Sequence, residues 1–346
     1  MFRQKKKTSR NTWFDNLKGL LIFSVVLGHF MQVGIDKDVT AAKGIWIFIY
    51  SFHMPLFLFT NGCMCEHVIN DKKKLKERVI ELFSLYVILK IIIFVIRSIG
   101  GKEPDFSLFS DSEIPWYLFA LAVFYLLSYV LKGFNKIWLL SFSIILALIA
   151  GFDSTLEDFC QISRVIVFYP FFVLGWIIGI ERIQKFVRQM WVRIVGIIVL
   201  AALVYVCVCH LDDYYIFREL FTGRNPYNRV DVSYYFAPLY RLITYVISVI
   251  VSIGVMAIVP NRRLPVLNMM GQHTMQIYFF HRPILYILTY VGLYWKMSDM
   301  IGNAAIYVWG VCALLLCIVL VFPMFGKPLK WYSKVINSQR MNKNKE

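Results

Sequence analysis

The stretch LKGLLIFSVVLGHF, residues 17–30, is an apolar run with a lysine near its start and a histidine near its end. A membrane-spanning helix needs about 20 mostly apolar residues, and this run with its neighbours supplies them. Eleven residues separate Lys18 from His29, so at 100° per residue both side chains share one helix face, about 16 Å apart. Titratable side chains inside a span are expensive, and they mark candidate functional positions.

The rest of the chain repeats this apolar character, because 59% of its 346 residues are hydrophobic. Soluble domains are usually about 45–50% apolar. Segments of spanning length or close to it occur at 16–34, 44–64, 79–98, 115–131, 137–152, 162–180, 192–210, 237–259, 274–294 and 303–324. The predicted fold is therefore all-α: a polytopic membrane protein of about ten transmembrane helices over 16–324, with basic tails at 1–15 and 325–346. The first apolar run is too long for a secretory signal, and no small-residue cleavage site follows it.

The distribution of lysine and arginine predicts the orientation. With the N-terminus in the cytoplasm, the cytoplasmic segments carry 24 of these residues and the opposite loops carry 7. This asymmetry follows the positive-inside rule and places both termini in the cytoplasm of a cell-membrane protein. It also accounts for most of the net charge of +16, which favours contact with anionic membrane lipids. A nucleic-acid partner is not expected, since no basic face with base-reading elements is seen.

The cysteines do not indicate a metal site. The two C-x-C pairs, at 63–65 and 207–209, lack partners at zinc-site spacing. Six of the seven cysteines lie in or at the ends of apolar segments, which is typical of small packing residues. No metal is therefore expected.

The first predicted helix and its start carry three titratable side chains. Asp15 lies one turn before Lys18 and is expected to pair with it at the cytoplasmic edge. His29 then lies in the outer half of the membrane. Alternatively, Lys18 snorkels to the interface and His29 is a packed, hydrogen-bonded residue.

Further polar residues occur in the later spans. His53, in SFHMPLFLFTNG (51–62), lies at about the depth of His29, beside Pro55, which is expected to kink its helix. Arg78, in KKKLKERVIELF (72–83), could hold phosphates at the cytoplasmic side or could simply be a positive-inside flank. Glu81 and Lys90 are on opposite helix faces, so each is expected to find a partner on another helix.

The last polar positions belong to the second half of the chain. Arg241 and His281 lie within predicted spans. The loop 211–236 mixes arginines with tyrosines, a composition typical of a sugar-binding surface and equally of interfacial anchors.

Five motifs resemble a known family. WFDNLKGLLIFSVVLGHF (13–30), IYSFHMPLFLFTNG (49–62), WYLFAL (116–121), YPFFVLGWIIG (169–179) and GQHTMQIYFFH (271–281) are similar to motifs of the acyltransferase-3 family of integral membrane O-acyltransferases. They look closest to its fucose 4-O-acetylase-like branch. The resemblance covers about 13–325, in order.

The resemblance implies a ten-helix enzyme that moves an acetyl group from cytoplasmic acetyl-CoA to a hydroxyl of an outward-facing glycan. Its first-helix signature is an arginine followed eleven positions later by a histidine needed for activity, which here are Lys18 and His29. The lysine keeps the charge but loses bidentate phosphate recognition. The family's second basic position best matches Arg78.

These implications lead to an assignment of roles. We expect His29 to act as the base, or as a relay that briefly carries the acyl group, because histidine titrates near neutral pH. His53 would assist near the acceptor, and Asp15 would orient Lys18. Lys18 and Arg78 would hold CoA, while Arg241 and His281 would bind the carbohydrate acceptor, a surface polysaccharide or its lipid-linked precursor.

Two other functions fit parts of the sequence. A transporter of a glycan or an organic anion would also place charge inside the membrane, although no pair of related halves is visible. A receptor or scaffold would not require the polar stripe of the first helix. The sequence indicates no oligomeric state.

Overall fold

The computed structural model describes residues 10–108, 114–156, 161–230 and 233–343, and within these ranges the chain forms helices and turns and no strand. The first nine residues of the predicted N-terminal tail, Cys160 and the last three residues lie outside the described part. The C-terminal tail is largely helical, because most of it belongs to the helix Pro323–Lys343.

Eleven helices carry most of the apolar sequence. They are α1 (Thr12–Ile35), α2 (Thr40–Tyr50), α3 (His53–Cys63), α5 (Lys72–Ile99), α6 (Trp116–Val130), α7 (Lys136–Ala150), α8 (Ile162–Ile178), α10 (Met190–Cys209), α13 (Ala237–Ile258), α15 (Thr274–Tyr290) and α17 (Ala305–Val319). The remaining elements are short or polar: α4 (Glu66–Ile69), α9 (Ile180–Val187), α11 (Leu211–Tyr215), α12 (Arg218–Phe221), α14 (Pro265–Gln272), α16 (Leu293–Ile301), α18 (Pro323–Lys343), and the 3₁₀ turns η1 (Ser154–Leu156), η2 (Tyr227–Arg229) and η3 (Gly302–Ala304).

All ten predicted segments fall on helices, but the helices differ in length. In the described ranges six are long and apolar enough to cross a membrane: Thr12–Ile35, Thr40–Cys63, Lys72–Ile99, Met190–Cys209, Ala237–Ile258 and Leu293–Val319. The pair α8–α9 makes a seventh if it is one span, although it bends by 86°. Helices α6 and α7 are apolar but shorter, so the count of ten crossings stays a prediction.

Two helix breaks have identifiable causes. The second predicted span divides at Ser51 and Phe52, one turn before Pro55. Proline has no N–H to bond the carbonyl four residues earlier, so Pro55 is accommodated in the first turn of a new helix instead of inside a kinked one. Helix α8 ends at Gly179, whose φ of +70° is readily adopted by glycine, and α9 then leaves at a steep angle.

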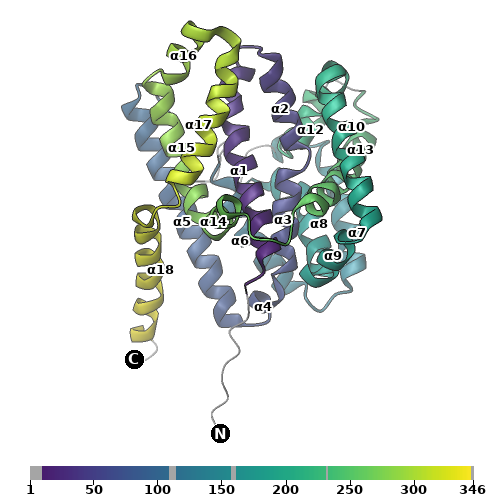
Figure 1. Cartoon of the computed structure of the whole chain (residues 1–346). Coiled ribbons are helices and arrows are strands. Elements are labelled where there is room, and N and C mark those ends of the chain that lie inside the picture. The colour runs from purple at the N-terminus through teal and green to yellow at the C-terminus, as the bar shows by residue number, and fades with distance from the viewer. Residues whose placement is uncertain (1–9, 109–113, 157–160, 231–232, 344–346) are drawn as a thin grey trace.

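The helices pack around α1, which runs through the middle of the bundle (Figure 1). It contacts α2, α14, α15 and α17, while α3 packs on α8, α5 on α6, and α10 on α13. At the end nearest the chain termini, Lys136 donates to Glu66 at 2.7 Å and holds the pKa of that carboxyl below its usual range. Both described ends of the chain lie at this same end of the bundle (Figure 1).

Large apolar side chains also cover the outside of the bundle. Val130, Trp138, Met190 and Val208 are among many that stay exposed. Such an apolar surface is expected where hydrocarbon, not water, surrounds the protein.

Candidate active site

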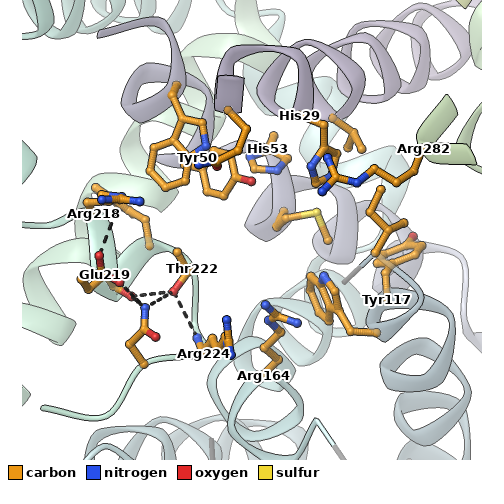
Figure 2. Close-up of a pocket in the computed structure, with 18 of the residues that line it drawn as sticks. His29, Tyr50, His53, Tyr117, Arg164, Arg218, Glu219, Thr222, Arg224 and Arg282 are labelled. Carbon is orange, nitrogen blue, oxygen red and sulfur yellow. Dashed lines mark hydrogen bonds and ion pairs between the residues drawn. The ribbon is translucent and has the colours of Figure 1, made fainter. Parts of the chain in front are cut away.

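A cavity of about 470 Å³ lies between α1, α2, α3, α6, α8, α15 and the loop that contains α12. Its residues on α1, Val25, His29 and Gln32, belong to the half of that helix farther from the N-terminus. Its lining is aromatic and strongly polar (Figure 2). The side chains that carry chemistry there are His29, Trp46, Tyr50, His53, Trp116, Tyr117, Arg164, Arg218, Glu219, Thr222, Arg224, Asn225, Arg229, Tyr278 and Arg282.

Two predicted catalytic residues, His29 and His53, lie on this lining (Figure 2). The Nδ1 atom of His53 is 2.9 Å from the carbonyl oxygen of Ile49, one turn earlier. A carbonyl only accepts, so Nδ1 carries the proton, and Nε2 is the nitrogen that can take up another. The His53 ring also meets the ring of Tyr50 edge-on at 4.6 Å.

Among the described residues the ring of His29 has no comparable anchor. No hydrogen bond of the His29 ring is present in the described part of the chain, and its nearest aromatic neighbour is the His281 ring, with centroids 5.5 Å apart. His29 lies beside Arg282 in Figure 2. Both histidines therefore lie on the lining of the same cavity.

Arginines are the most frequent charged residues of the lining. Five are present, and within the described ranges Glu219 is the one carboxylate among the lining residues. The Arg164 guanidinium lies 4.9 Å above the Trp116 ring and donates to the Gln161 side chain at 3.0 Å. Guanidinium groups and aromatic faces together suit oxygen-rich, sugar-like ligands, because they combine forked donors with stacking surfaces.

The loop with α12 is tied to the bundle by Arg241, a predicted acceptor-binding residue. Arg241 is fully buried and does not line the cavity. Its guanidinium donates to the carbonyl oxygens of Ala147 at 2.9 Å and Asn225 at 3.1 Å, and it lies over the Tyr227 ring at 4.6 Å. Arg241 therefore holds the wall that carries Asn225.

The other predicted acceptor-binding residue, His281, lies behind His29. It is fully buried and is absent from the lining. Its Nδ1 lies 3.0 Å from the carbonyl oxygen of Ile277 and 2.7 Å from that of Tyr278.

Asp15 and Lys18 pair as predicted, at 3.0 Å, but they do not reach the cavity. The buried Asp15 carboxylate also accepts from Arg10 at 2.5 Å. Both cations therefore gather at the first turn of α1, at the opposite end of the helix from His29.

Arg78 lines a second pocket, of about 230 Å³, with His67, Lys74, Glu77, Glu81 and Ser333. Glu81 pairs with Arg78 at 3.0 Å, so the expectation of a partner on another helix was wrong for this residue: the partner is one turn back on α5. Lys90 also bonds within α5, to Tyr86, and to the carbonyl oxygen of Ser107 in the following loop.

Polar side chains form a link between the two pockets. Arg78 lies close enough to Tyr125 and Tyr117 for its charge to act on these residues. Tyr117 lines the large cavity and accepts from the Asn61 amide at 2.9 Å. The described residues hold no group of three or more histidine, cysteine or acidic side chains that could bind a metal ion.

The cavity contains residues that the sequence did not assign to a site. Arg164 and Arg282 lie inside the predicted spans 162–180 and 274–294, and the loop arginines belong with tyrosines to the loop 211–236. What the sequence lacked was the cross-helix arrangement that brings α8, α12 and α15 to the same histidines.

Comparison with known proteins identifies the family. Residues 11–322 match the family model described as an acyltransferase domain, that of the acyltransferase-3 family. The nodulation protein NolL of Sinorhizobium fredii is 26% identical over 234 residues, 61% of each chain. The NolL protein of Mesorhizobium japonicum is 27% identical over 190 residues, 49% of this chain and 48% of that one.

The matched stretches thus span about three fifths and about half of these curated relatives, and no solved structure matches the chain. The family match covers nearly the whole described fold, including every lining residue of the large cavity and all those of the second pocket except Ser333. The chain belongs to the acyltransferase-3 family, and its described part has several helices long and apolar enough to cross a membrane.

Proposed function

We propose that this protein is a membrane O-acetyltransferase that moves an acetyl group from cytoplasmic acetyl-CoA to a hydroxyl of a carbohydrate. The observation that carries this proposal is the pair His29 and His53 on one wall of a large polar cavity, in a chain of an acyltransferase family. Acyl transfer to an alcohol needs a base at the hydroxyl, and a histidine is suited to that task at neutral pH.

In the proposed reaction, His29 takes the hydroxyl proton as the oxygen forms its bond to the acetyl carbon. The carbon–sulfur bond then breaks, and the same proton passes from His29 to the departing CoA thiolate. Arg282, beside His29 in Figure 2, would stabilise the negative charge that develops on the carbonyl oxygen. His53, with its proton fixed on Nδ1, would accept a hydrogen bond from the acceptor through Nε2.

The acyl donor would enter from the side of the chain termini. Arg78, in the second pocket, and Lys18, oriented by Asp15, would bind the CoA phosphates. The long pantetheine arm would then run past Asn61 and Tyr117 toward His29, along the polar link between the pockets. This route resolves the separation between Lys18 and His29 on α1, because the phosphates and the thioester bind at different depths.

The acceptor would be a surface polysaccharide or its lipid-linked precursor. Trp46, Tyr50 and Trp116 supply aromatic surface to the lining against which a sugar could pack, and the loop arginines present donors for ring hydroxyls. The resemblance to the fucose 4-O-acetylase-like branch favours the same class. The charge asymmetry of the loops supports a cell-membrane protein with both termini cytoplasmic, so that this cavity faces outward.

The proposal is tested by the acetyl content of surface glycans. Mass spectrometry would compare cells with the intact gene, without it, and with His29→Ala at matched protein levels. Loss of acetyl groups in both altered strains is the expected result. Normal acetylation with less glycan exported from the null strain would instead indicate the transporter.

A further inference from the structure

His281 has a fixed protonation pattern that the proposed reaction does not use. Two backbone carbonyl oxygens, of Ile277 and Tyr278, lie within 3.0 Å of its Nδ1. Since both groups only accept, Nδ1 must be the protonated nitrogen of the neutral ring. The lone pair of His281 therefore resides on Nε2.

That lone pair lacks a partner in the described part of the chain. His281 is fully buried, and its Nε2 makes no hydrogen bond there. A buried acceptor without a donor is unfavourable by about 1–3 kcal/mol, and native structures rarely retain one. A donor is therefore expected nearby.

His29 is the side chain placed to supply it. The two ring centroids are 5.5 Å apart, and rings at this spacing bring facing nitrogens to roughly 3 Å, an ordinary hydrogen-bond length. The other ring recorded against His281, that of Tyr278, has its centroid 6.0 Å away and its hydroxyl bonded to the carbonyl oxygen of Ile114 at 2.5 Å. His29 itself makes no hydrogen bond in the described ranges, so its ring is available to turn toward His281.

We propose that His281 is a positioning residue for His29: its Nε2 accepts the N–H of the His29 ring and leaves the other His29 nitrogen, with its lone pair, facing the cavity. This contact selects one tautomer and one ring orientation of His29. The backbone carbonyls fix His281, and His281 in turn fixes the base. The catalytic role of this contact rests on the proposed function, but the existence of the contact does not depend on it.

Two variants separate this role from simple packing. In His281→Gln, the longer side chain brings a carbonyl oxygen to about the position of Nε2 and keeps an acceptor for His29. In His281→Asn, the amide still reaches the backbone carbonyls but is too short to reach His29. His273→Asn is the matched control, because His273 also has its Nδ1 near a carbonyl oxygen one turn earlier, that of Met269 at 2.8 Å, and does not line the cavity.

The direct measurement is the tautomer of His29. Full-length protein labelled with ¹⁵N-histidine would be reconstituted in lipid bilayers, and solid-state NMR would distinguish protonated from unprotonated ring nitrogens. A His29→Ala sample assigns the signals. We expect one His29 tautomer in the wild type and in His281→Gln, and a mixture in His281→Asn.

The kinetic measurement uses acetyl-CoA with water as the acetyl acceptor, and release of free CoA by protein in lipid nanodiscs is the readout. His281→Asn should lower kcat about 10- to 100-fold, a part of what general-base catalysis contributes, with the KM for acetyl-CoA within about twofold. His281→Gln should recover most of the loss, and His273→Asn should behave as wild type.

Two results would overturn the inference. One is a single, unchanged His29 tautomer in folded His281→Asn. The other is a defect of equal size in His281→Gln and His281→Asn. If His29→Ala keeps full CoA release while the tautomer still responds to His281, the contact is real and the proposed role of His29 as the base has failed.

Discussion

At the residue scale, the two cavity histidines differ in what surrounds them. His53 is anchored through Nδ1 to Ile49, which suits a fixed hydrogen-bond acceptor. His29 lies between the cavity and the buried ring of His281, which suits a group that must take up and release a proton. We therefore expect His29 to act as the base and His53 to bind the acceptor.

A substitution at His29 should show the difference in role between His29 and His53. His29→Gln keeps a polar side chain of similar reach but removes the basic nitrogen. It should lower the rate of acetyl transfer by about 10²- to 10⁴-fold, whereas His53→Gln should retain more activity because it can still hydrogen-bond an acceptor. Rates measured at matched protein levels would decide, and equal losses in the two variants would contradict this assignment.

Lys18 makes a separate prediction about the donor. Lys18→Gln removes one charge-assisted hydrogen bond to a CoA phosphate and should raise the KM for acetyl-CoA about 5- to 30-fold with kcat nearly unchanged. Lys18→Arg should bind at least as well, because a guanidinium can hold phosphate with two donors. A fall in kcat at constant KM would place Lys18 in the chemistry instead of in donor binding.

The sequence predicted these residues because polar side chains stand out in apolar runs. It predicted the pairing of Asp15 with Lys18, which the structure shows, and it singled out His29 and His53, which both line the cavity. It did not distinguish Arg241 and His281 from residues that line the cavity. Both are polar side chains in spans, and only cross-helix packing shows that one holds a loop and the other lies behind His29.

At the element scale, close helix contacts fix the cavity walls. A Cβ added to Gly62 on α3 would lie 2.0 Å from the carbonyl oxygen of Phe172 on α8. One added to Gly175 on α8 would lie 2.1 Å from that of Phe59 on α3. The two glycines therefore let these backbones approach, which sets the distance between His53 and Arg164 across the cavity.

A substitution at Gly175 tests the close contact between α3 and α8. Gly175→Ala should force α3 and α8 apart and destabilise the protein by about 1–3 kcal/mol, as overpacking does. Gly310→Ala is the control, because a Cβ there would meet Leu27 at an ordinary 3.5 Å. Thermal unfolding in detergent would compare them, and equal melting temperatures would show that the α3–α8 contact is not tight.

Hydropathy predicted the helices better than their breaks. Every predicted segment falls on helices, and Pro55 was expected to kink its helix, but neither the division between α2 and α3 nor the turn at Gly179 was predicted. An apolar window averages over about 20 residues, so it cannot register a single non-helical residue such as Phe52.

At the scale of the whole molecule, the proposed orientation places one end of α10 outside the cell. Cys209, its last residue, is exposed, and α10 is long enough to span. In a variant that keeps only this cysteine, a membrane-impermeant maleimide should label intact cells. A single cysteine at Gln189, just before the other end of α10, should react only after the membrane is opened. The reverse pattern would invert the topology.

The buried guanidinium of Arg241 has a consequence for how the protein meets its surroundings. The loop that Arg241 holds contains Arg218, Arg224 and Arg229, and trypsin cleaves peptide bonds after arginine. The hydrogen bond from Arg241 to the carbonyl oxygen of Asn225 restrains this loop. In Arg241→Met that tie is lost while side-chain bulk is largely kept, so added trypsin should cut this loop in intact cells faster than in wild type. Fragment sizes on a gel would report it. The resistance of this loop to extracellular proteases would then depend on Arg241, a buried residue that a protease cannot contact.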